Sequence, residues 1–192
     1  MLLAAGEGSR FGRPKALVEW DGQTLAARGV GVLLAGGADP VLVVSGAALI
    51  DPGSEPRVHL VHNEEWRTGM GSSLRAGLRA LPEPDVDAVV VALADQPLVG
   101  PEAVARLIAA GQAGAAVAVA AYEGQPRNPV LLAREHWPEV IALATGDQGA
   151  RAFLRARPDL VTLVECGDIS RPDDIDTPAD LDRIAGRRPP GR

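Results

Sequence analysis

Residues 2–15 have the sequence LLAAGEGSRFGRPK, from Leu2 to Lys15, in which a short apolar run leads into a glycine-rich loop. Glycines allow backbone N–H groups to close around phosphate oxygens, and cationic side chains add positive charge. A merely flexible, solvated turn is the alternative, but such a turn does not need cations. The stretch therefore predicts a phosphate-binding loop after a buried first strand. The residues concerned are Gly6, Gly8, Gly12, Arg10 and Lys15.

Two familiar phosphate-binding loops fit this stretch poorly. A Walker loop requires Gly-Lys-Ser/Thr, whereas Gly12 is followed by Arg13-Pro14-Lys15 without a hydroxyl side chain. A dinucleotide-binding loop needs an acidic residue at the end of the second strand to hold a ribose, but that strand ends Val44-Ser45-Gly46. The first of these loops is excluded, and the second is disfavoured.

The composition indicates one globular domain. The chain has 192 residues, 46% of them hydrophobic, which is enough to enclose one core. We expect a single domain over residues 1–186 and a disordered tail over 187–192. The aromatic fraction of only 3% predicts a core of small aliphatic side chains, as in layered α/β proteins. The first strand has about four residues, below the ~5 to 6 that are typical, which allows a true start upstream of Met1.

The net charge and the hydropathy of the sequence limit the classes of binding partner that we expect. The formal net charge of −6 disfavours a protein that wraps nucleic acid. No apolar run approaches the ~20 residues of a membrane span, and the first residues lack the features of a signal peptide. Cys166 is the only cysteine, so neither an intrachain disulfide nor a thiolate zinc site is supported. We expect a cytoplasmic protein with neither a nucleic-acid nor a membrane partner.

Short apolar runs alternate with amphipathic stretches along the chain, which predicts a three-layer α/β/α, Rossmann-like fold with a mostly parallel sheet. Residues 124–132 form a turn-rich hinge and a short strand, too close to the preceding strand for a helical crossover, so one antiparallel strand is expected. We predict strands at 1–4, 41–45, 57–62, 88–94, 115–122 and 160–164. Helices are expected at 24–35, from Ser72 or Ser73 to 81, from 101, at 135–143 and 148–155, and from Thr177.

The loop resembles the Leu-Ala-Ala-Gly-x-Gly-x-Arg-x-Gly-x-x-Lys signature of the MobA-like nucleotidyltransferases, and within them it is most similar to the molybdenum cofactor cytidylyltransferases. This resemblance implies the nucleotidyltransferase form of the α/β fold. Family members commonly carry His where this chain has Asn128, so any role of an imidazole there is lost. The similarity continues through residues 63–74, 95–97, 124–129, 146–151 and 174–178.

A magnesium ion is the cofactor that this resemblance implies. Asp95 follows the predicted strand 88–94, so its carboxylate should lie at the carboxyl edge of the sheet, where Mg²⁺ takes one or two carboxylates together with phosphate oxygens. Asp176 is the second candidate ligand. A simple turn aspartate at 95 and a helix-capping role at 176 are the alternatives. The implied catalytic residues are Arg10, Lys15 and Asp95.

The resemblance also implies a nucleotide-binding set and an acceptor-binding set. Ordinary helix capping explains the serines nearly as well, and Asp147 and Arg151, one helical turn apart, could instead form a local salt bridge. The nucleotide-binding set is Leu3, Ala4, Ala5, Gly6, Gly8, Gly12, Lys15, Gly69, Ser72 and Ser73. The acceptor-binding set is Gln96, Pro126, Arg127, Asn128, Asp147 and Arg151.

The implied activity is transfer of a nucleoside monophosphate, with release of pyrophosphate. In the family, alanine at the position of Ala5 accompanies CTP, whereas glycine accompanies GTP, so CTP is favoured. The implied acceptor is the phosphate of molybdopterin, and a hydroxylase-type molybdoenzyme is the implied client. Three alternatives stay open: a nucleotidyltransferase for sugar phosphates or other small metabolites, a non-catalytic nucleotide or pterin carrier, and an NAD(P)-binding oxidoreductase.

Overall fold

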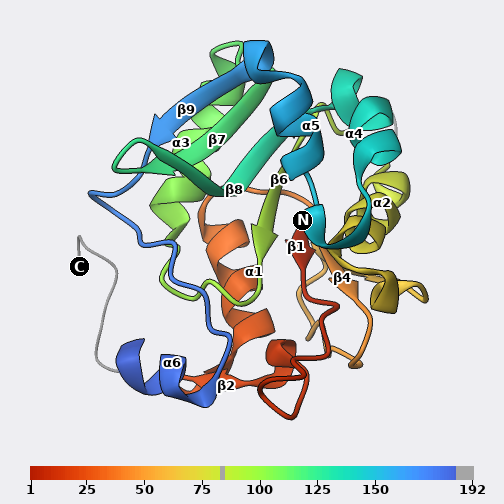
Figure 1. Cartoon of the computed structure of the whole chain (residues 1–192), viewed down its shortest axis with the longest axis vertical. Coiled ribbons are helices and arrows are strands. Elements are labelled where there is room, and N and C mark those ends of the chain that lie inside the picture. Colours follow the sequence, from red (N-terminus) through yellow and green to blue (C-terminus); the bar gives the residue numbers. More distant parts are fainter. Residues whose placement is uncertain (83–84, 185–192) are drawn as a thin grey trace.

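A seven-stranded mixed sheet forms the centre of the protein (Figure 1). The computed structural model describes residues 1–82 and 85–184, and the predicted tail 187–192 lies outside them. β8 runs antiparallel to both of its neighbours, and the other pairs are parallel, which confirms the predicted sheet. In spatial order the strands are β5 (Val58–His62), β4 (Val41–Ser45), β1 (Leu2–Leu3), β6 (Ala88–Leu93), β8 (Gln125–Ala133), β7 (Val117–Tyr122) and β9 (Val161–Glu165).

Helices cover both faces of this sheet, as the sequence predicted. Successive side chains of a strand point to opposite faces, so Leu2 packs under one set of helices and Leu3 under the other. One face is covered by α1 (Leu25–Ala35) and α3 (Pro101–Gln112), and the other by α2 (Met70–Ala80), α4 (Trp137–Leu143) and α5 (Arg151–Ala156). Along the described residues, no helix is long and apolar enough to cross a membrane.

The C-terminal segment returns to the N-terminal loop. Ile175 and Ile184, the latter on helix α6 (Pro178–Ile184), are fully buried against Val18, Leu25 and Leu98. This packing lies beside a small hairpin that the sequence did not predict, formed by β2 (Glu19–Trp20) and β3 (Gln23–Thr24). Short 3₁₀ helices complete the fold: η1 (Lys15–Leu17), η2 (Trp66–Thr68), η3 (Arg134–His136), η4 (Gly146–Gln148) and η5 (Pro158–Leu160).

Two local predictions were wrong. Helix α2 does not begin at a serine cap, because η2 runs directly into it through Gly69, whose φ of 106° favours glycine. Ser72 and Ser73 therefore lie in the first turn of α2, where both are buried. The strand after the hinge is not short either, since β8 has nine residues and pairs with both β6 and β7.

Candidate active site

A cleft of about 570 Å³ lies at the carboxyl ends of β1 and β6. From β1 the chain continues to β4, which pairs with β1 on one side, whereas β6 pairs with β1 on the other side. Such a switch point in an open α/β sheet leaves a crevice in which ligands bind. The lining residues are Leu3, Ala4, Ala5, Gly6, Glu7, Gly8, Lys15, Ala16, Trp66, Arg67, Gly69, Met70, Ser73, Leu93, Ala94, Asp95 and Asp147.

The glycine-rich loop folds back on itself at Gly8. Its φ of 62° lies in the left-handed region, and a Cβ there would collide with the backbone oxygen of Arg13 and approach the backbone nitrogen of Lys15 within 3.0 Å. Gly8 is therefore required for the loop to close and for Lys15 to reach the cleft. Gly12 also has a positive φ, of 72°, but it does not line the cleft.

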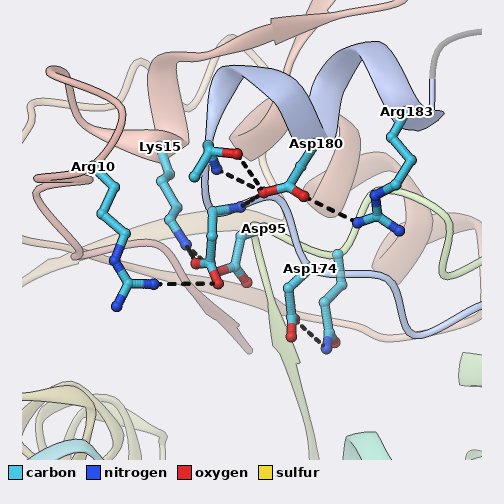
Figure 2. A network of polar contacts seen from close by, with 9 residues as sticks. Arg10, Lys15, Asp95, Asp174, Asp180 and Arg183 are labelled. Atoms are coloured by element: carbon cyan, nitrogen blue, oxygen red, sulfur yellow. Dashed lines mark hydrogen bonds and ion pairs between the residues drawn. The ribbon is translucent and has the colours of Figure 1, made fainter.

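Lys15 joins two carboxylates that lie far apart in the sequence (Figure 2). Its Nζ donates to Asp95 Oδ2 at 2.9 Å and to Asp176 Oδ1 at 2.5 Å. Partial burial lowers the pKa of Lys15, but the charge of Asp95 and the hydrogen bonds to both carboxylates outweigh this and raise that pKa above its ordinary value. Arg10 Nη1 lies 3.9 Å from Asp176 Oδ2. The Lys15 side chain is therefore a cation held at the floor of the cleft.

The C-terminal segment brings Asp176 to this position. Ile175 N donates to Asp95 O at 2.8 Å, and Gln96 Nε2 donates to Asp174 Oδ1 at 2.8 Å. Desolvation raises the pKa of Asp174, and the nearby negative charges of Asp95 and Asp176 act in the same direction, against the hydrogen bond from Gln96. These hydrogen bonds hold two segments of the chain, residues 95–96 and 174–176, side by side.

Asp180 caps the start of α6. Its Oδ2 accepts hydrogen bonds from Asp176 N, Thr177 N and Thr177 Oγ1. Hydrogen bonds from the Thr177 side chain and backbone lower the pKa of Asp180 to about 2. The expected helix at Thr177 is confirmed, but its hydroxyl group donates to Asp180 and does not itself act as the capping acceptor. This cap leaves the Asp176 carboxylate free to face Lys15.

The two carboxylates fit a divalent cation. Asp95 and Asp176 already converge on a single cation, the Lys15 ammonium group. The described residues contain no group of three or more His, Cys, Asp or Glu side chains that could hold a metal ion. A hard cation held by these two carboxylates would take its other ligands from phosphate oxygens and water, which is the usual arrangement for Mg²⁺.

Asn63 is a positioning residue that the sequence did not single out. Its buried Nδ2 donates to Ser72 Oγ at 2.8 Å and to Ser73 Oγ at 3.0 Å. Ser72 Oγ lies 2.8 Å from the backbone oxygen of Gly69 and 2.9 Å from that of Glu65, and its one proton is shared between these two acceptors. Ser72 thus fixes the start of α2, and it does not line the cleft. Ser73 does line the cleft.

The acceptor-binding set is only partly gathered at the cleft. Asp147 lines it and lies so close to Gly69 that a Cβ there would approach Asp147 Oδ1 within 2.6 Å. No ion pair between Asp147 and Arg151 is found within the described ranges. Val130 on β8 pairs with Val91 on β6, so residues 125–129 run past the carboxyl end of β6. The predicted residues that do not line the cleft are Arg10, Gly12, Ser72, Gln96, Pro126, Arg127, Asn128, Arg151 and Asp176.

The chain is similar to known proteins over most of its length. A family model described as a MobA-like NTP transferase domain matches residues 1–161. "Nicotine blue oxidoreductase" of Paenarthrobacter nicotinovorans is 37% identical, over 96% of this chain and 94% of the relative. "Purine catabolism protein PucB" of Bacillus subtilis is 29% identical over the same shares.

Solved structures share the fold over nearly the whole chain. Rv0371c of Mycobacterium tuberculosis has a TM-score of 0.82 and 26% identity, covering 96% of this chain and 95% of the other. A complex of Rv0371c with manganese has a TM-score of 0.75 and 25% identity, covering 97% and 96%. A molybdopterin-guanine dinucleotide biosynthesis protein A of Archaeoglobus fulgidus, 21% identical over 95% and 94% of the two chains, has a TM-score of 0.63 and so shows the shared fold.

Proposed function

The chain belongs to the MobA-like NTP transferase family and is a nucleotidyltransferase of that family; we propose that it transfers CMP from CTP to the phosphate of a small acceptor. A phosphate oxygen of the acceptor attacks the α-phosphorus of CTP, the bond from that phosphorus to the bridging oxygen breaks, and pyrophosphate leaves. Such a reaction needs positioned charge and no protein nucleophile. The observation that carries the proposal is the convergence of Lys15, Asp95 and Asp176 beside the glycine-rich loop.

The residues take their roles from this arrangement. We assign the nucleotide to the part of the cleft lined by residues 3–8, Gly69 and Ser73, and charge neutralisation on the phosphates to Arg10 and Lys15. Asp95 and Asp176 are the proposed Mg²⁺ ligands. A bound Mg²⁺ would neutralise charge on the phosphates. The manganese complex of the structural neighbour Rv0371c supports a divalent cation in this fold.

Molybdopterin is the proposed acceptor, and a hydroxylase-type molybdoenzyme is the proposed client. We place the acceptor on the side of residues 125–129, which lie at the carboxyl end of β6, and of Asp147, which lines the cleft. Gln96 and Arg151 stay in the proposed acceptor set. We further propose that residues 1–186 work as one domain in the cytoplasm.

Ala5 is the proposed determinant of the pyrimidine base. It is buried, and a Cβ placed on Gly46 would lie 2.8 Å from the Ala5 methyl group, so this wall of the cleft is tightly packed. We expect Ala5→Gly to widen the base pocket and to raise turnover with GTP relative to CTP by about ten-fold, the scale of one methyl or methylene in a packed pocket. The measurement is kcat/KM with each nucleotide. A variant as selective for CTP as the original chain would contradict this role.

A nucleotide and acceptor screen tests the function itself. The purified chain is incubated with each NTP, MgCl₂ and either molybdopterin or a panel of sugar phosphates, and pyrophosphate release is followed. We expect release with CTP and molybdopterin, and none when EDTA removes the metal. Release with a sugar phosphate alone would replace the proposed acceptor. CTP binding without release in any combination would favour a carrier.

An oxidoreductase is the second candidate, because the relative from Paenarthrobacter carries that name. The end of β4 argues against it, since Ser45-Gly46 provides no carboxylate for a ribose. A parallel set of reactions with NADH or NADPH and quinone-like dyes, followed by the loss of absorbance of the reduced nicotinamide, separates the two candidates. Nucleotide oxidation above the rate without protein would favour the oxidoreductase.

A further inference from the structure

Trp66 and Arg67 form part of the cleft wall beside Ala5, and the proposed function gives neither of them a role. A Cβ added to Gly46 would come within 2.6 Å of Trp66 Cβ and within 2.8 Å of Ala5 Cβ, so these three residues pack closely. The guanidinium carbon of Arg67 lies 4.2 Å from the centroid of the Trp66 ring. The Trp66 ring thus supports a planar cation beside the proposed base pocket.

Arg67 and Lys15 both carry a positive charge at the cleft, but they differ in their ion pairs. Both residues line the cleft, but Lys15 is held by two carboxylates. Arg67 is exposed and makes no salt bridge with any carboxylate in the described part of the chain. A guanidinium group that stacks on an aromatic ring uses its face and keeps the N–H donors in its plane for another partner. Arg67 therefore lines the cleft with a pair of parallel donors that no carboxylate in the described part of the chain engages.

We propose that Arg67 is a specificity-determining residue that reads the pyrimidine ring of the nucleotide, an inference that rests on the proposed function. Cytosine offers two adjacent acceptors, O2 and N3, which match two parallel N–H donors. Uracil carries an N–H at position 3, which would face the donors of Arg67. Guanine also offers adjacent acceptors, at O6 and N7. The Ala5 methyl group, however, narrows the base pocket and so disfavours the larger purine ring. Ala5 thus selects ring size, and Arg67 selects cytosine over uracil.

Binding to the full chain without acceptor tests this role, with CTP, UTP and inorganic triphosphate as probes in calorimetric titrations. We expect Arg67→Ala to weaken CTP binding by about ten-fold, the scale of a bidentate base contact, and to bring the CTP and UTP dissociation constants close together. Triphosphate binding should not change. Arg67→Lys should not restore the preference, because an ammonium group lacks the planar pair of donors.

Arg79→Ala is the matched control, because Arg79 is an exposed arginine near the other end of α2 and outside the cleft. It should bind all three probes as the original chain does. Equal weakening of CTP and triphosphate by Arg67→Ala would overturn the inference in favour of a phosphate contact, and unchanged CTP binding would overturn it outright. Failure of the original chain to bind CTP would overturn the proposed function as well.

Discussion

Lys15→Ala is expected to lower the rate of pyrophosphate release by about 10² or more, the scale on which a single donor to a developing charge acts. Lys15 Nζ lies at the floor of the cleft, in contact with both proposed metal ligands. Its raised pKa keeps the ammonium group charged at neutral pH, and deprotonation of Lys15 weakens the two ion pairs only as the pH rises through that pKa. The measurement is kcat with CTP at saturating Mg²⁺ and neutral pH.

A second measurement on Lys15→Ala separates its role on phosphate from its role on the carboxylates. Without the ammonium group, Asp95 and Asp176 have no competing cation from Lys15, so Mn²⁺ without nucleotide should bind the variant more tightly, while CTP binds more weakly. Arg13→Ala is the control, since Arg13 is an exposed cation of the same loop that does not line the cleft. Near-normal turnover of Lys15→Ala would remove Lys15 from the proposed mechanism.

The inner part of the sheet was predictable because β4, β6 and β7 are buried apolar runs, whereas the edge strands β5 and β9 are largely exposed and were predicted from their alternating apolar and polar residues. The run 88–94, for example, gave β6 to within one residue at its C-terminal end. The hairpin of β2 and β3 was missed because each of its strands has only two residues, partly exposed or exposed, and so carries no periodic signal. The start of α2 was missed because capping rules favour serine, whereas the local backbone depends on Gly69.

In the site, too, features that depend on one segment were predictable from the sequence, and contacts between distant segments were not. The glycine-rich loop could be identified from spacing, since Gly8 and Lys15 belong to one continuous segment. The contact of Lys15 with Asp176 spans 161 positions and depends on the packing of Ile175 and Ile184 against the hairpin region. Arg67 stacks on Trp66, its neighbour in the sequence. The sequence does not show that this pair lies beside Ala5, because that depends on the packing of Trp66 against Gly46 at the end of β4.

Asp95→Asn is expected to lower turnover by about 10² or more as well, for a different physical reason. The amide keeps the size of the side chain and the backbone hydrogen bond from Ile175 to residue 95, so the fold should persist. The loss of one negative charge weakens the hold on a divalent cation, because Asp176 alone remains as a proposed ligand. The Mg²⁺ concentration that gives half-maximal activity should therefore rise, and the melting temperature should change little.

Asp87→Asn provides the matched control at the opposite end of the same strand. Asp87 precedes β6, and its carboxylate makes an exposed ion pair with Arg134, at 3.2 Å, whose loss should cost little. The backbone oxygen of residue 87, which accepts from Arg134 N, is unchanged by the substitution. We expect this variant to keep its turnover and its Mg²⁺ dependence. If Asp95→Asn released pyrophosphate at a near-normal rate with an unchanged Mg²⁺ requirement, Asp95 would not be a metal ligand. The carboxylates of Asp95 and Asp176 would then serve only to hold Lys15 in the cleft.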